Sequence, residues 1–523
     1  MIGCKVMDIR KHISPYEKKV YKLTRPIGDL SYCYKQKFSS HRFYTVEFLL
    51  KLCGFNMEDF SKNVKELLPR KITQLSQSGS RMSSNCMVVQ FDEDHDDVIR
   101  WAFANGAIIA VTRTQIDDYP CVVVDDPEEV YTKICTYIRN LNQVEVTVVA
   151  GSIGKTSTKK MVDSVYSTHF KTFNDPENEN QLPCIGYAIQ HIPKGTQQQV
   201  QELSEDIPGC LDKMVRILSP KIAIITAIDR SHIESFGSEK AVYDEVATVI
   251  EKMPADGIVI INLDDKVITQ YVQKCKTITI SMDNSEADYY ARNIKLTKKG
   301  LAFNIIERSS KNSFHIYLNR IYARHNVYTA LYAFAAGRQA GVPYKKCIKG
   351  IERFKMVGIR QNVYNDIWNK NIIYADCYNA VAKSVISAIE TASAIPVEGR
   401  RIAVLGDVEE AGDFSVQTHC DIVKCVNSSN FDILIAYGDK LCNAISSNSQ
   451  IRESLTIYKT SQKSDIVSLL RVSLRRGDLV LFKSSRKSAL ETIIKGVWGT
   501  TYRLQMIKYY WAVIKWRLKV LLN

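Results

Sequence analysis

The pattern of apolar and polar positions divides the chain into three segments that each mix helical periodicity with short apolar runs. In the first segment the helical patterns are amphipathic and end near a glycine, whereas the apolar runs have the length of buried strands. The helical patterns lie at 44–53 and 97–105, and the strand-like runs lie at 86–91, 108–111 and 121–124. This mixture predicts a small α/β domain over residues 1–140.

The second segment, residues 141–357, has continuous apolar runs with helical patterns between them. The runs at 144–149, 222–225 and 257–262 are rich in valine and isoleucine. Alternation of such strands with helices predicts a doubly wound parallel sheet. Residues 276–318 follow with a pattern typical of antiparallel strands, and we expect a helix over 326–341 to close the segment.

The third segment, residues 358–523, repeats the alternation and predicts a Rossmann-like sheet. No Gly-x-Gly-x-x-Gly fingerprint accompanies it. Its strand-like runs are 372–376, 401–405, 432–436 and 478–482. The predicted fold class is therefore α/β with three domains: a small substrate domain, a central ATPase-type parallel sheet and a C-terminal Rossmann-like domain.

A glycine-rich loop follows the first strand of the second segment and predicts a phosphate-binding cradle. Gly151 and Gly154 let the backbone turn tightly, and the helix that follows offers N–H groups and its positive dipole end. Lys155 is placed to neutralise phosphate oxygens, and the Thr156 hydroxyl to bind Mg²⁺. Because Val149 stands where the full phosphate-loop spacing has glycine, an ordinary strand–helix turn is the alternative interpretation.

Charge and composition narrow the function. The net charge of +14 comes with basic residues in the first 81 and last 23 positions, which suits an anionic nucleotide-linked substrate or simply solubility. No nucleic-acid motif occurs, so we expect no nucleic acid as a partner. No apolar run reaches the roughly 18 residues of a membrane span, and the N-terminus lacks the apolar core of a signal peptide, so we expect a cytoplasmic protein. The 14 cysteines are scattered without a Cys-x-x-Cys pair, which favours buried thiols.

Taken in order, the motifs resemble the Mur ligase family, and most the MurF branch, which adds D-alanyl-D-alanine to a UDP-linked muramoyl tripeptide. The glycine-rich loop is similar to the family's Thr-Gly-Ser-x-Gly-Lys-Thr-Thr, and the resemblance extends from about residue 78 to 500. The stretches that carry it are 78–81, 150–159, 178–183, 200–209, 231–238, 253–262, 324–331, 374–380, 401–410 with His419, and 482–486.

The resemblance implies an ATP-dependent carboxylate–amine ligase that forms an amide through an acyl phosphate in cell-wall synthesis. It implies ATP and Mg²⁺ as cofactors, and a UDP-linked peptide precursor with an amino acid or dipeptide as substrates. The implied catalytic residues are Lys155, Glu202 and His232, and the metal ligands are Thr156, Glu202 and His232. The implied nucleotide contacts are Gly151, Ser152, Gly154, Lys155, Thr156, Ser157, Asn326, Arg360, Asp376 and Asn379, and the substrate contacts are Ser80, Arg81 and Lys483. A hinge is expected near Gly358 and Arg360.

One departure from the family pattern affects the metal chemistry. Val246 stands where the family carries a carbamylated lysine, so the second metal loses an anionic ligand. Adjacent residues on a helix point about 100° apart, so neither Glu245 nor Asp244, one and two residues before it, reaches the same place. We therefore expect the metal on Thr156 and Glu202 to be kept and the second to be weak or absent.

Two alternatives to a MurF-like activity remain open. One is a Mur-like ligase of another pathway, and the other is a catalytically silent, nucleotide-binding homologue that acts as a scaffold. The C-terminal stretch 504–521 has one apolar stripe and no acidic residue, which is typical of a terminal helix packed on the third domain or of a basic helix resting on an anionic membrane or a partner helix. We expect the protein to be a monomer.

Overall fold

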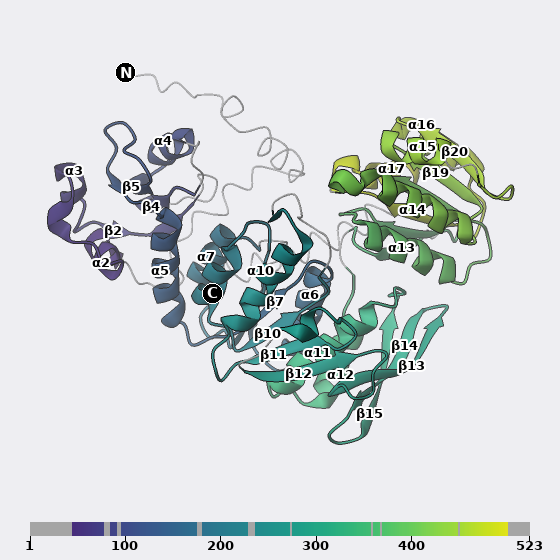
Figure 1. Cartoon of the computed structure of the whole chain (residues 1–523), viewed down its shortest axis with the longest axis horizontal. Helices are drawn as coiled ribbons and strands as arrows, with labels where there is room; N and C mark the ends of the chain where they lie inside the picture. Colours follow the sequence, from purple (N-terminus) through teal and green to yellow (C-terminus); the bar gives the residue numbers. More distant parts are fainter. Residues whose placement is uncertain are drawn as a thin grey trace.

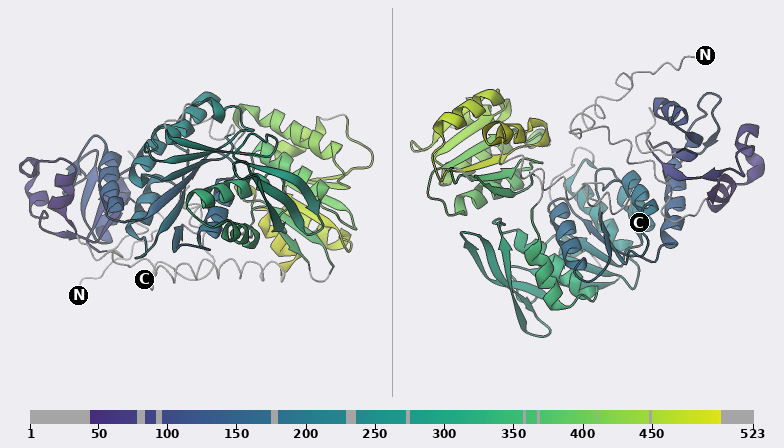
Figure 2. Two further views of the ribbon diagram at one scale, coloured as in Figure 1. Left: turned by 90° about the horizontal axis from the view of Figure 1, so that it is seen from below. Right: turned by 180° about the vertical axis from the view of Figure 1, so that it is seen from behind.

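In its described residues the computed structural model contains four β-sheets: three larger sheets, each covered by helices, follow one another along the chain, and a two-stranded sheet accompanies the first of them (Figure 1; Figure 2). The predicted α/β class is confirmed. The structure describes residues 44–77, 84–91, 96–174, 180–228, 236–271, 275–356, 359–366, 369–409, 411–447 and 450–499.

The central sheet has the strand order β15-β14-β13-β12-β11-β10-β7-β9-β8. In this order, every pair of neighbours from β13 to β8 is parallel. The pairs β13–β14 and β14–β15 are antiparallel. The strands are β7 (Glu145–Ala150), β8 (Thr172–Asn174), β9 (Gln198–Glu202), β10 (Ile222–Ile225), β11 (Ile258–Asn262), β12 (Lys276–Ser281), β13 (Tyr289–Thr297), β14 (Gly300–Glu307) and β15 (Asn312–Asn319).

Helices cover both faces of the central sheet because its strands are apolar on both sides. Val148 of β7 packs into one core with α5, α7, α8 and α10, and its neighbour Val149 packs into another with α6, α11 and α12. These helices are α6 (Lys155–Tyr166), α7 (Leu182–Gln190), α8 (Cys210–Leu218), α10 (Glu239–Glu251), α11 (Asn326–Gln339) and α12 (Tyr344–Arg353). The layered arrangement places every βα turn of the parallel strands at one edge of the sheet.

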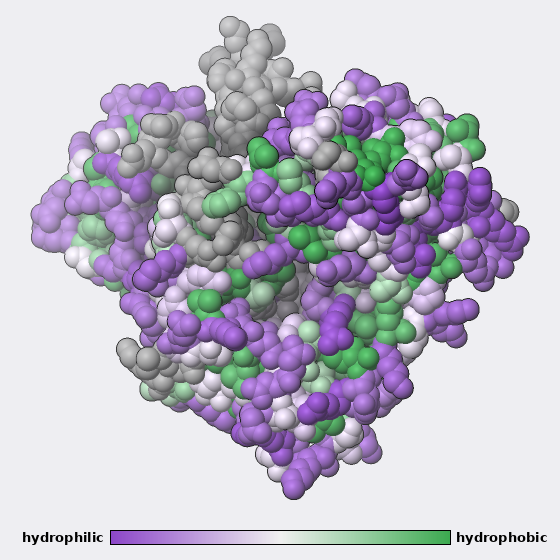
Figure 3. All heavy atoms as spheres, turned by 45° about the vertical axis from the view of Figure 1, so that its right-hand side comes forward, coloured by the Kyte–Doolittle hydropathy of each residue, from purple (hydrophilic) through white to green (hydrophobic). Residues whose placement is uncertain are grey.

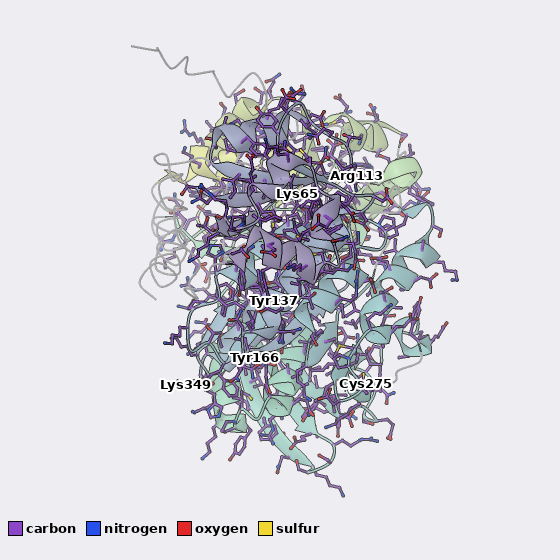
Figure 4. All side chains as sticks on the ribbon, turned by 90° about the vertical axis from the view of Figure 1, so that its left-hand side faces the viewer. Lys65, Arg113, Tyr137, Tyr166, Cys275 and Lys349 are labelled. Carbon is purple, nitrogen blue, oxygen red and sulfur yellow. The ribbon has the colours of Figure 1, made fainter. Side chains whose placement is uncertain are left out.

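The N-terminal sheet is a parallel one of order β3-β4-β5-β6, accompanied by the antiparallel pair β1-β2. Helix α5 links it to the central sheet, and its Tyr137 packs edge-on against Tyr44 and Phe48 of the N-terminal part (Figure 4). Its elements are β1 (Tyr44–Thr45), α2 (Val46–Leu52), η3 (Met57–Asp59), α3 (Lys62–Lys65), β2 (Lys71–Ile72), β3 (Gln74–Ser76), β4 (Cys86–Val89), α4 (Asp96–Ala104), β5 (Ala107–Thr112), β6 (Cys121–Val123) and α5 (Pro127–Asn140).

The C-terminal sheet has the order β16-β17-β21-β18-β19-β20, in which only β16 is antiparallel to its neighbour. Two apolar cores, one on each face, hold its helices, as the predicted Rossmann-like alternation requires. The strands are β16 (Asn362–Asn365), β17 (Ile372–Asp376), β18 (Arg401–Gly406), β19 (Ile433–Tyr437), β20 (Thr456–Thr460) and β21 (Leu479–Lys483). The helices are α13 (Ala382–Ala394), α14 (Ser415–Ser428), α15 (Asp439–Ser446), α16 (Lys463–Ser473) and α17 (Glu491–Val497).

One detail of the predicted topology is wrong. The segment 276–318 was expected to be antiparallel throughout, but its first strand, β12, is parallel to both β11 and β13. The reason is that β12 continues the parallel sheet, and only the long strands β13, β14 and β15 are joined by short hairpin connections. The antiparallel part is therefore a three-stranded extension of the parallel sheet.

The surface and the cysteines fit a globular chain. The face drawn in Figure 3 is mainly hydrophilic, with separate hydrophobic areas. The cysteines in the described ranges form no disulfide, and burial raises the pKa of the Cys86 thiol to about 12, so it stays protonated at neutral pH. No helix in the described ranges is long and apolar enough to cross a bilayer.

Candidate nucleotide site

The loop after β7 has a conformation that only glycine supports at its first position. Gly151 has φ +116°, and a Cβ there would lie 2.4 Å from the Oγ1 of Thr226. The next two N–H groups, of Ser152 and Ile153, both donate to the carbonyl of Ala227 at 2.9 Å. The loop is therefore fixed against the end of β10 while it turns towards α6.

Helix α6 begins in the way that an anion site requires. Gly154, its N-cap, has φ +88° and provides no side-chain cap, and the first turn contains no acidic residue. The positive end of the helix dipole therefore lies next to Lys155 and Thr156, with Ser157 following in the first turn. Thr156 is buried, so its hydroxyl is held within the loop and not in bulk solvent.

Two buried glutamates lie at the end of β9, which pairs with β7. Glu202 is 2% exposed, and its Oε1 accepts a hydrogen bond of 3.1 Å from the Asn180 side chain. Its Oε2 has no hydrogen-bond partner and lies 4.0 Å from the Nζ of buried Lys159. Glu205, 1% exposed, forms a 2.7 Å ion pair with Lys155. Matched positive and negative charges therefore lie in a buried setting beside the phosphate loop.

The start of α11 connects the central part of the chain to the C-terminal part. The Asn326 side-chain amide donates to the carbonyl of Ala323 and to the Oε1 of Gln361, both at 3.1 Å. The Oδ1 of Asn326 is buried and has no hydrogen-bond partner. His325 contacts the same Gln361 oxygen at 3.0 Å and the hydroxyl of Ser387 at 3.2 Å. Asn326 is 1% exposed, and its unpartnered amide oxygen is suited to accept a hydrogen bond from a ligand.

Gln361 continues this contact into the C-terminal sheet. Its backbone N–H donates to the Oδ1 of Asp376 at 3.1 Å, although Gln361 has φ +48°, a conformation that is strained for a side-chain-bearing residue. Burial lowers the pKa of His325 below its ordinary value of 6.5, while its hydrogen bond to Gln361 acts in the opposite direction. His325 is therefore neutral at pH 7.

Asp376 and Lys483 form a buried ion pair at the ends of two neighbouring strands. The Asp376 Oδ2 lies 2.9 Å from the Lys483 Nζ, which also donates to the carbonyl of Asn379 at 2.8 Å. The Asn379 side chain is exposed and accepts only the N–H of the next residue. Arg360 stacks on the ring of Tyr378 at 3.7 Å. The four predicted residues Arg360, Asp376, Asn379 and Lys483 are thus close neighbours, with Lys483 bound to protein groups.

The 401–410 stretch, similar to a MurF signature, ends in a tight polar turn. Asp407 accepts the N–H groups of Lys440 and Leu441 at the start of α15, and the Nε2 of His419 accepts the N–H of Val408. The hydrogen bond from Lys440 holds the pKa of Glu409 below its usual range. These contacts fix the turn within the C-terminal sheet.

Three predicted site residues, Ser80, Arg81 and His232, lie outside the described residues, as does the stretch 504–521. Within the described ranges no group of three His, Cys, Asp or Glu side chains is arranged to hold a metal. Val246 is fully buried in the core. Glu245 accepts the N–H groups of Gly209 and Leu211 at the start of α8, and Asp244 binds Lys240 and Tyr271. Both carboxylates are engaged elsewhere.

Sequence reasoning missed Glu205, Lys159 and Gln361. A signal for Glu205 existed, since it follows Glu202 by three residues at the end of a strand that a parallel sheet places beside the phosphate loop. The sequence around Gln361 gave no such signal, because its contacts depend on the left-handed backbone conformation of Gln361 itself.

Comparisons with known proteins agree with this geometry. Residues 149–337 match the Mur ligase middle domain, and residues 359–486 match the Mur ligase, glutamate ligase domain. The phosphate loop and Asn326 lie in the first match, and Asp376 and Lys483 lie in the second.

Two relatives are UDP-N-acetylmuramoyl-tripeptide–D-alanyl-D-alanine ligases. That of Bacillus subtilis is 28% identical over 381 residues, which is 72% of this chain and 81% of the relative. That of Escherichia coli is 25% identical over 410 residues, 77% of this chain and 88% of the relative.

Solved structures share the fold. MurF from Acinetobacter baumannii has a TM-score of 0.76 at 21% identity and covers 88% of this chain and 99% of its own. MurF from Thermotoga maritima, in complex with ADP, has a TM-score of 0.71 at 20% identity and covers 82% of this chain and 98% of its own. The chain belongs to the Mur ligase family.

Proposed function

We propose that this protein is an ATP-dependent ligase of the MurF type, which joins a dipeptide such as D-alanyl-D-alanine to the peptide of a UDP-muramoyl precursor. The observation that carries the proposal is the uncapped start of α6, with Lys155 beside it and buried Glu202 on the adjacent strand. The relatives that cover most of this chain bear the name of that activity.

The proposed chemistry has two steps. A carboxylate oxygen of the precursor attacks the γ-phosphorus of ATP, ADP leaves, and an acyl phosphate forms. The amine of the dipeptide then attacks the acyl carbon, the C–O bond to phosphate breaks, and an amide, inorganic phosphate and a proton result. Because phosphoryl transfer depends mainly on alignment and charge neutralisation, the protein's task is to hold the reactants in line.

The described residues divide this task. Lys155 and the N–H groups at the start of α6 bind the β- and γ-phosphates, and Asn326 with its free Oδ1 contacts the adenine. Asp376 and Asn379 lie near the ribose, and Arg360 near the nucleotide. Ser80, Arg81, His232 and Lys483 keep the roles that the family resemblance implies.

The donor set fits Mg²⁺, a hard cation that prefers oxygen ligands. The hydroxyl of Thr156 and the carboxylate of Glu202 would hold it, and the buried Oε2 of Glu202 has no hydrogen-bond partner. When bound, the cation would neutralise charge on the phosphate oxygens.

The test is phosphate release by the purified protein with ATP, D-alanyl-D-alanine and a panel of UDP-muramoyl peptides. We expect release that requires both substrates in the wild type and none in Lys155→Ala, with circular dichroism checking that this variant folds without the Lys155–Glu205 ion pair. Nucleotide binding without turnover on any substrate pair would favour the silent scaffold instead. Turnover only with acceptors outside the muramoyl series would favour a ligase of another pathway.

A further inference from the structure

The ion pair between Lys155 and Glu205 conflicts with the role of the lysine. Their side chains are 11% and 1% exposed, and 2.7 Å separates the Lys155 Nζ from the Glu205 Oε2. The ammonium that should meet the β- and γ-phosphates is therefore already bound to a carboxylate. Glu205 lies three residues after the end of β9 at Glu202, at the same sheet edge as the phosphate loop.

Releasing Lys155 would leave Glu205 in an unfavourable state. Its Oε1 is buried and has no hydrogen-bond partner, so Lys155 is the cation that compensates its charge. Removing one partner of a buried ion pair is strongly unfavourable, because the remaining charge is shielded from water. An incoming polyphosphate would add like charge beside that carboxylate and raise the cost further.

The local charge balance decides which form of the nucleotide can enter. Lys155 and Lys159 offset Glu202 and Glu205, so these four side chains sum to zero before any ligand binds. A metal-free polyphosphate would bring only negative charge to this neutral cluster. A divalent cation on Glu202 brings positive charge with the nucleotide and compensates the carboxylate that Lys155 leaves.

Resting on the proposed function, we propose that Glu205 makes nucleotide binding conditional on the divalent cation. The Lys155–Glu205 pair excludes the metal-free nucleotide and admits the magnesium complex. Glu205 is thus a residue that determines specificity for the metal-bound form of the nucleotide.

Isothermal titration calorimetry of the full chain with ATP, in Mg²⁺ and separately in EDTA, tests this. The quantity of interest is the ratio of the Kd in EDTA to the Kd in Mg²⁺. We expect Glu205→Gln to lower this ratio at least about tenfold, mainly by tightening binding in EDTA, since it removes the charge that holds Lys155. Glu205→Ala should do the same, and circular dichroism checks that both variants fold.

Asp206→Asn is the matched control. It removes the same charge from the neighbouring residue, which is half-buried and accepts a hydrogen bond from Gln181. The control should keep the wild-type ratio. Equal ratios in the wild type and both folded Glu205 variants would overturn the inference alone. Failure of the wild type to bind ATP even with Mg²⁺ would overturn the proposed function and this inference together.

Discussion

The buried pair between Asp376 and Lys483 should stabilise the C-terminal part of the protein, and the single substitution Lys483→Met tests this. The two side chains are 8% and 3% exposed and lie at paired positions of β17 and β21. Replacing the lysine leaves the Asp376 carboxylate buried, with the N–H of Gln361, 3.1 Å from its Oδ1, as its remaining hydrogen-bond donor among the described residues.

The magnitude follows from burial. Removing one member of a buried pair costs about 3–5 kcal/mol, whereas exposed pairs contribute about 0–1 kcal/mol. Replacing both residues, as in Asp376→Asn with Lys483→Met, removes both charges and should restore most of the loss. Lys424→Met is the control, because the pair of Lys424 with Asp421 is 66% and 45% exposed.

Hydrogen exchange measured by mass spectrometry is the suitable assay, because a chain with three sheets is not expected to unfold in one two-state step. Peptides that contain β17 and β21 report opening of the C-terminal sheet itself. A loss of about 3 kcal/mol accelerates their exchange roughly 10²-fold, since about 1.4 kcal/mol corresponds to tenfold. Unchanged exchange in Lys483→Met, or a double variant as impaired as the single one, would refute the reasoning.

Four further predictions address the nucleotide site and the tail. Gly151→Ala should abolish nucleotide binding measured by calorimetry, because its Cβ would lie 2.4 Å from Thr226 and φ is +116°. Burial lowers the folded-state pKa of His325, so the stability that its neutral imidazole contributes is full above pH 6.5 and is lost as the pH falls through the lowered pKa. His325→Gln should therefore flatten the fall of the melting temperature between pH 7 and 5. Ligase activity should need high Mg²⁺ or Mn²⁺ and ignore bicarbonate, since Val246 cannot be carbamylated; full turnover at low Mg²⁺ would contradict this. Co-sedimentation with anionic liposomes at low salt decides between the interpretations of 504–521: a helix packed on the third domain leaves the full chain and a chain ending at Gly499 equally in the supernatant, whereas a membrane-binding helix sediments the full chain alone.

The local features of the fold were predictable because their causes are local. Strands such as β7 and β10 are runs of β-branched and small apolar residues, and β7 is bounded by Gly151, whose φ of +116° few other residues adopt. Helix α5, which apolar periodicity did not predict, also has a local signal: the Asp126 side chain accepts the N–H of Glu129, and Pro127 is its first residue. Reading caps as closely as periodicity would have found it.

The remaining features depend on contacts between distant parts of the chain. The parallel pairing of β12 with β11 follows from the crossover between them, which includes the short 3-10 helix η5 (Ile268–Gln270), and not from the residues of β12. The Lys155–Glu205 pair joins residues 50 positions apart, and sequence alone gives no orientation for either side chain. The predicted roles of Lys155, Glu202 and Asn326 came from motif resemblance. Only the structure shows that Lys155 is paired with Glu205 and that the buried Glu202 and Asn326 each have an oxygen without a hydrogen-bond partner.

The contact between the central and C-terminal parts gives the nucleotide a way to influence both. The Asn326 amide, the Gln361 side chain, the Gln361 N–H and the Asp376–Lys483 pair form a continuous series of hydrogen bonds. Gln361 adopts its strained left-handed conformation while making these bonds, and such strain persists only where surrounding contacts outweigh it. A ligand that uses the free Asn326 Oδ1 therefore acts on a residue that already holds the two parts together. With the proposed contact of Asn326 to adenine, nucleotide binding and the position of the C-terminal sheet would be coupled through Gln361, a residue that belongs to no recognisable motif.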